Sequence, residues 1–221
     1  MDLFAQYDNY CERTDFSFWS EPLNAMTNGG FILVGLIAIY LLWRRSELGS
    51  AKLLHCLAWV MIAIGTGSFL FHTLATHWAM LADIYPIYLF QIIFLWAYPR
   101  RALSLTRWQT TLFFIAYAAV TVASGHLPVT LNGSEMYLPT IVTLLLFSGA
   151  YRARHGQFDR YLASAAGLFA LSLTMRTIDN TTCDVLPIGT HFLWHTFNAL
   201  VLFLCWYSLY WHQYRSGNLT R

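Results

Sequence analysis

The segment LLHCLAWVMIAIGTGSFLFHTLA, at residues 53–75, contains no Asp, Glu, Lys or Arg. About 20 apolar residues suffice for a helix to cross a bilayer, so this segment indicates a membrane span. Six further stretches are also predominantly apolar, and together the expected spans lie at about 24–43, 53–75, 79–98, 108–125, 136–152, 160–178 and 188–211. The sequence therefore predicts an all-α integral membrane protein, a bundle of seven transmembrane helices.

The composition supports a single membrane domain over residues 1–221. Hydrophobic residues make up 57% of the chain and charged residues only 11%, whereas a soluble domain carries about 25% charged residues. The first apolar stretch is too long for a secretory signal peptide, and residues 1–22 before it are too polar. We therefore expect a permanent first span that follows a polar N-terminal segment.

Basic residues gather in every second connection between the expected spans. The residues concerned are Arg44, Arg45, Lys52, Arg100, Arg101, Arg107, Arg152, Arg154 and Arg160. Because Lys and Arg favour the cytoplasmic side, we predict an outer or lumenal N-terminus and a cytoplasmic C-terminus. The net charge of +2 has this topological origin and does not indicate a nucleic-acid partner.

Five polar residues in or beside the apolar spans point to a functional site: Ser68, His72, Asp83, His191 and His195. Such residues are costly in a bilayer, and they mark functional sites by default. Residues four apart share a helix face, so Ser68 lies with His72, and His191 lies with His195. All five fall at the outer ends of spans two, three and seven. Three histidines with an open fourth position form the ligand set of a catalytic zinc site.

Other interpretations remain at this stage. Each of the five residues, taken alone, could serve helix packing, and Asp83 could pair with Arg176. The histidines could instead ligate haem in a membrane cytochrome, or hold a structural metal in a receptor or transporter. A serine intramembrane protease is disfavoured, because Ser68 lacks a following glycine.

The four cysteines divide between loops and spans. Cys11 and Cys183 are expected on the outer side, where disulfides persist. They are the only pair of loop cysteines on the same side, although the sequence does not prove their pairing. Cys56 and Cys205 lie within spans and are interpreted as packing residues.

Several motifs resemble the alkaline ceramidases, part of a superfamily of seven-transmembrane zinc hydrolases that includes the adiponectin receptors. The motifs are Ser68-x-x-x-His72 with Asp83, His191-x-x-x-His195, Asn9-Tyr10-Cys11-Glu12, Ser20-Glu21-Pro22-Leu23-Asn24 with Asn28, and Arg176-Thr177-Ile178-Asp179-Asn180 with Cys183. The resemblance implies zinc held by His72, His191 and His195, with Asp83 holding the water of the metal and Ser68 facing the substrate carbonyl. It also implies a disulfide between Cys11 and Cys183.

The resemblance further implies a calcium site in the N-terminal segment. Glu12 and Glu21 match two of the family's calcium ligands. Asn9, Tyr10 and Thr14 stand where the family has an aspartate, a tryptophan and an asparagine. Calcium prefers six to eight oxygen ligands, and the loss of carboxylates predicts weaker binding.

The expected reaction is zinc-dependent hydrolysis of a lipid amide within the membrane. Zinc on three imidazoles lowers the pKa of its water to about 7. Asp83 would act as the general base and Ser68 would stabilise the oxyanion. The products would be a fatty acid and an amine. Ceramide or a related N-acyl lipid is the substrate that the resemblance implies, and membrane lipids are the expected surroundings.

Overall fold

The computed structural model describes residues 2–45, 51–126, 128 and 131–219. Within these ranges the regular elements are helices, and none of the described residues forms a strand. The helices are α1 (Pro22–Thr27), α2 (Gly29–Trp43), α3 (Lys52–Leu74), α4 (His77–Arg101), α5 (Arg107–Ser124), α6 (Leu138–His155), α7 (Arg160–Thr182) and α8 (His191–Leu219), with a short 3₁₀ turn η2 (Glu135–Tyr137) before α6. The expected all-α membrane bundle is confirmed.

Five helical segments are long and apolar enough to cross a membrane: Pro22–Trp43, Lys52–Leu74, His77–Arg101, Arg160–Thr182 and His191–Tyr214. They correspond to five of the seven expected spans. The other two, 108–125 and 136–152, form the shorter helices α5 and α6. Polar residues at the start of α5 and arginines near the end of α6 lower their hydropathy. Their crossing of the membrane, like the orientation of the termini, stays a prediction.

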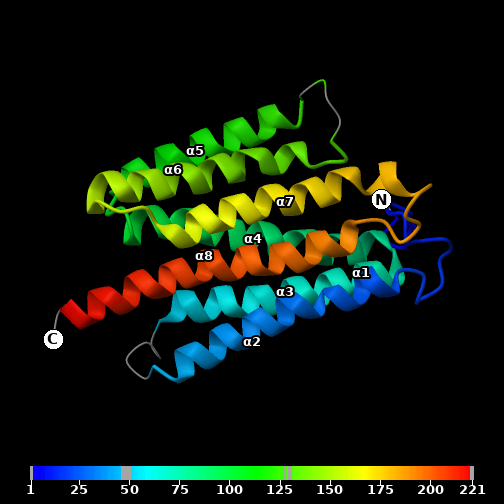
Figure 1. The fold of residues 1–221 in the computed structure, drawn as a ribbon, viewed down its shortest axis with the longest axis horizontal. Coiled ribbons are helices and arrows are strands. Elements are labelled where there is room, and N and C mark those ends of the chain that lie inside the picture. Colours follow the sequence, from blue (N-terminus) through cyan, green and yellow to red (C-terminus); the bar gives the residue numbers. More distant parts are fainter. Residues whose placement is uncertain (1, 46–50, 127, 129–130, 220–221) are drawn as a thin grey trace.

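The helices lie lengthwise beside one another, and α8 contacts α2, α3, α4 and α7 (Figure 1). The N-terminal segment lies at the end of the bundle where α3 and α7 end and α8 begins. We call this the histidine end, because His72, His191 and His195 lie there. Buried side chains such as Leu57, Met61 and Trp206 fill the core between the helices.

Glycines bring α3 close to its neighbours on both sides. A Cβ built on Gly67 would lie 2.0 Å from the carbonyl oxygen of Ala82 in α4, and one on Gly65 would lie 2.8 Å from the carbonyl oxygen of Asn28. Only glycine permits this approach, as small residues do at helix interfaces in membranes. The contact at Gly67 sets α4 against α3 directly before Asp83.

Backbone hydrogen bonds attach the N-terminal segment to the turn between α3 and α4. The amide of Tyr7 donates to the carbonyl of Ala75 at 2.8 Å, and the amide of His77 donates to the carbonyl of Ala5 at 2.9 Å. Ala75 adopts a left-handed conformation with φ 50°, which ends α3. The segment thus continues across the histidine end.

A buried carboxylate organises the opposite end of the bundle. Asp159 caps α7 and accepts hydrogen bonds from Tyr98 Oη at 2.9 Å, Ser208 Oγ at 2.5 Å and His212 Nε2 at 2.7 Å. Burial raises the pKa of the Asp159 carboxyl, but the hydrogen bonds from His212 and Ser208 outweigh burial and hold that pKa below its ordinary value. This hub joins α4, α7 and α8.

Candidate metal centre

Three histidines converge at the histidine end of the bundle. His72 lies near the end of α3, and His191 and His195 lie in the first turns of α8. All three are at most 2% exposed. One ring nitrogen from each lies within 4.8 Å of the others, and their ring centroids are 4.6–5.3 Å apart. The structure therefore brings the predicted ligands together.

The free nitrogens of this cluster fit a divalent metal. His72 Nε2 and His191 Nδ1 are buried and have no hydrogen-bond partner, although buried polar atoms nearly always have one. Three imidazoles that converge in this way match a zinc site. The rings lie too close together to hold a flat macrocycle between them, which favours zinc over haem. Within the described part of the chain, no other group of His, Cys, Asp and Glu is arranged to bind a metal.

Side chains of the N-terminal segment and α1 orient two of the rings. Glu21 Oε2 lies 2.6 Å from His72 Nδ1, and Thr27 Oγ1 lies 3.1 Å from His195 Nδ1. Such contacts fix the ring and make the opposite nitrogen a better ligand. His72 therefore presents Nε2 to the centre of the cluster.

Arg13 supports Glu21 and is itself only 4% exposed. Its Nε donates to Glu21 Oε1 at 2.5 Å, its Nη2 to the carbonyl of His72 at 2.9 Å, and its Nη1 to the carbonyl of Asp15 at 2.9 Å. Burial raises the pKa of the Glu21 carboxyl, but His72 and Arg13 outweigh burial and hold that pKa below its ordinary value. Glu21 thus stays ionised beside the histidines.

The carboxylates matched to calcium ligands have protein partners. Glu12 accepts hydrogen bonds from the backbone amides of Leu23 at 2.7 Å and Asn24 at 2.8 Å, at the start of α1. Burial raises the pKa of Glu12 despite these hydrogen bonds. Glu21 is engaged by Arg13 and His72, as described above. Of the other matched residues, Asn9 and Thr14 are exposed. Calcium binding stays a prediction.

Tyr10 covers the histidines from the side of the N-terminal segment. Its ring stacks on His191, with centroids 3.7 Å apart and planes 20° apart, and lies 5.3 Å from His72. The resemblance placed this residue only in the expected calcium site. Its ring contact needs the folded N-terminal segment and has no signature in the sequence.

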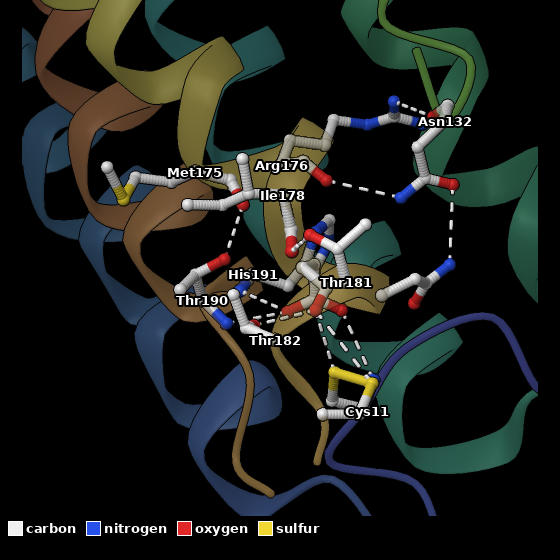
Figure 2. The surroundings of a disulfide bond; sticks show 12 residues. Cys11, Asn132, Met175, Arg176, Ile178, Thr181, Thr182, Thr190 and His191 are labelled. Atoms are coloured by element: carbon white, nitrogen blue, oxygen red, sulfur yellow. Dashed lines mark hydrogen bonds between the residues drawn. A yellow bond between two sulfur atoms is a disulfide. The ribbon is translucent and has the colours of Figure 1, made fainter. Parts of the chain in front are cut away.

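The predicted Cys11–Cys183 disulfide is confirmed. Next to it, the fully buried Asp179 accepts hydrogen bonds from the amides of Cys11 at 3.2 Å, Thr190 at 2.6 Å and His191 at 2.9 Å. Figure 2 shows the disulfide beside Thr190 and His191, at the start of α8. Asp179 therefore links the end of α7, the N-terminal segment and a predicted zinc ligand.

Ser68 and Asp83 lie beside the histidines. Ser68 is 2% exposed, one turn before His72 on α3. Asp83 lies on α4, where Ser68, His72 and Arg176 are the polar groups that influence its carboxylate. No ion pair joins Asp83 to Arg176 among the described residues.

Two cavities are lined in part by neighbours of the cluster. A polar cavity of about 660 Å³ lies beyond Tyr10, and its lining includes Asp8, Asn9, Arg13, Asn132, Arg176 and Asn180. An apolar cavity of about 50 Å³ lies between α4, α6, α7 and α8, and its lining includes Ile87, Phe90, Phe169, Asn198, Val201 and Leu202. Tyr10, which stacks on His191, lines the polar cavity, and Asn198, three residues after His195, lines the apolar cavity.

A family model described as Ceramidase matches residues 7–218, which is nearly the whole chain. No individual curated protein matches the sequence.

Proposed function

Because the chain belongs to the ceramidase family, we propose that it is a zinc-dependent amide hydrolase that cleaves ceramide or a related N-acyl lipid within the membrane. The observation that carries this proposal is the cluster of three buried histidines, two of them with an unpaired ring nitrogen, beside Ser68 and Asp83. Five apolar helical segments support action in a membrane.

His72, His191 and His195 would hold the zinc. When bound, zinc would supply a Lewis acid and a water acidic enough to ionise near neutral pH. Glu21 and Thr27 would keep two of the rings in the orientation that presents their free nitrogens. Tyr10 would shield the centre from the polar cavity above it.

Asp83 would act as the general base. Its carboxylate would accept a proton from the attacking water and pass that proton to the amide nitrogen as the C–N bond breaks. Ser68 would donate a hydrogen bond to the carbonyl oxygen as negative charge builds there, an interaction worth about 3 kcal/mol in other hydrolases. The products would be a carboxylic acid and a free amine.

The two cavities suggest how the substrate would lie. The apolar cavity would seat the first carbons of the acyl chain, and the polar cavity would receive the amine side with its hydroxyl groups. A lipid would bring both parts to the centre from the bilayer, since its scissile amide lies between its chains and its polar group.

The test combines metal analysis with lipid amide hydrolysis in purified protein. We expect His72→Ala, His191→Ala and His195→Ala each to lose both zinc and hydrolysis. Asp83→Ala should retain much of the zinc and lose turnover. His155→Ala is the matched control, because His155 lies at the opposite end and contacts the carbonyl of Ala102. Full activity in zinc-free protein or in Asp83→Ala would contradict the proposal.

A further inference from the structure

Asn198 is a largely buried residue whose side chain forms no hydrogen bond with the described part of the protein. It lies three residues after His195 on α8 and is 4% exposed. None of the other described residues forms a hydrogen bond with its carboxamide, which faces the apolar cavity. A carboxamide that lines a mostly apolar cavity gains free energy from a polar partner there. The position therefore calls for a polar partner that enters the cavity.

The cavity offers Asn198 few alternatives. The other amide in its lining is Gln91 on α4, whose Nε2 already donates to Tyr117 Oη at 2.6 Å and Thr140 Oγ1 at 2.7 Å. An ordered water needs two to four polar partners, and aliphatic and aromatic side chains make up most of the remaining lining. A polar group on the bound lipid would satisfy Asn198 better than water.

The position of Asn198 relative to the metal centre limits which part of a lipid it can meet. A helix rises 1.5 Å per residue, so Asn198 lies about 4.5 Å beyond His195 along α8. The cavity continues past it to Val201 and Cys205. A chain that extends from a carbonyl at the metal centre would therefore pass Asn198 within its first few carbons.

We propose that Asn198 is a specificity-determining residue that hydrogen-bonds a hydroxyl group near the carbonyl of the substrate's acyl chain. This inference rests on the proposed function. A hydroxyl both donates and accepts, and so matches the carbonyl oxygen and the NH₂ group of a carboxamide. The enzyme would then prefer N-acyl lipids whose acyl chain is hydroxylated on its second or third carbon.

The test uses N-acyl lipids that share one amine and differ only in the acyl group: palmitoyl, 2-hydroxypalmitoyl or 3-hydroxypalmitoyl. One hydrogen bond of ordinary strength corresponds to about a tenfold higher kcat/KM for a hydroxylated substrate in the wild type. Asn198→Leu should lose that preference, so that its kcat/KM no longer differs between the palmitoyl and the hydroxypalmitoyl lipids. Leu202→Met, one turn further along the same cavity, is a volume-conserving control and should keep the preference.

A binding measurement separates this inference from the proposed function. Wild-type protein should bind free 2- or 3-hydroxypalmitate about tenfold more tightly than palmitate, and Asn198→Leu should bind all three equally. If the wild type hydrolyses no lipid amide, the proposed function fails and the binding comparison still tests Asn198. The inference would be overturned if the wild type hydrolysed hydroxylated and plain lipids with equal kcat/KM and bound the corresponding free acids equally tightly. This outcome does not depend on whether Asn198→Leu folds.

Discussion

Glu21→Gln is the substitution that tests the support of the metal centre most directly. Glu21 is 3% exposed and joins Arg13 to His72. Glutamine keeps the size of the side chain but removes the negative charge beside His72 Nδ1. Loss of such an outer contact costs about 10–100-fold in metal affinity, which is about 1.4–2.7 kcal/mol. We expect a loss of zinc affinity in that range.

The same substitution also leaves the buried guanidinium of Arg13 without its ionic partner. Removal of one member of a buried ion pair costs about 3–5 kcal/mol of folding stability. Two backbone carbonyls still accept from Arg13, so we expect the lower end of that range. Zinc affinity would be measured by competition with a chelator, and stability by thermal unfolding of the metal-free protein.

Glu12→Gln provides the matched control. Glu12 belongs to the same segment but accepts only backbone amides at the start of α1, so we expect about 1 kcal/mol of lost stability with zinc affinity unchanged. If calcium held both carboxylates, the two variants would instead lose a calcium response together. An unchanged zinc affinity in Glu21→Gln, or an equal loss in both variants, would refute the orienting role of Glu21.

Three further predictions concern the fold, two of them near the site and one at the opposite end of the bundle. Gly67→Ala should abolish hydrolysis and lower folding stability by about 1–3 kcal/mol or more, because the new Cβ would clash with the backbone of Ala82. Gly149→Ala is the control, since a Cβ at Gly149 meets nothing within 4 Å, and it should be neutral or stabilising in thermal unfolding. Cys11→Ser should lower folding stability by up to about 5 kcal/mol, because the disulfide closes a loop with a sequence separation of 172. A reductant should lower the melting temperature of the wild type but not that of the variant. The pKa of Asp159 is lower in the folded than in the unfolded protein. Its contribution to stability is therefore present above the unfolded pKa of about 3.9 and is lost as the pH falls through the folded pKa. Between pH 5 and pH 3, Asp159→Asn should lose less stability than the wild type, and an equal loss in both proteins would contradict this prediction.

The convergence of the histidines was predictable because it depends on helix periodicity and depth alone. His191 and His195 share a face of one span, and His72 falls at the same end of another. The pairing of Cys11 with Cys183 followed from topology and from the family resemblance. These features need only regular helices of known length, which the apolar pattern specifies.

The supporting residues could not be predicted in the same way. Arg13 and Glu21 lie on an irregular segment, which has no periodicity to indicate that it turns back onto His72. Asp179 was noticed only within a family motif. Its contact with the amide of His191 depends on the backbone at Gly189, where φ is 62° and a Cβ would lie 2.2 Å from Asp179 Oδ1. Such contacts arise from tertiary structure and leave little trace in the local pattern.

These supporting contacts extend the metal centre beyond the apolar helices. Glu21 orients His72, Tyr10 stacks on His191, and the disulfide ties Cys11 to the loop that leads into α8. A segment that moved away would expose one ring and release another at the same time. The geometry of the histidines therefore depends on a docked N-terminal segment as well as on the packing of α3 against α8. For this reason, loss of the Cys11–Cys183 bridge should weaken zinc binding as well as global stability, whereas a purely structural bridge would affect stability alone.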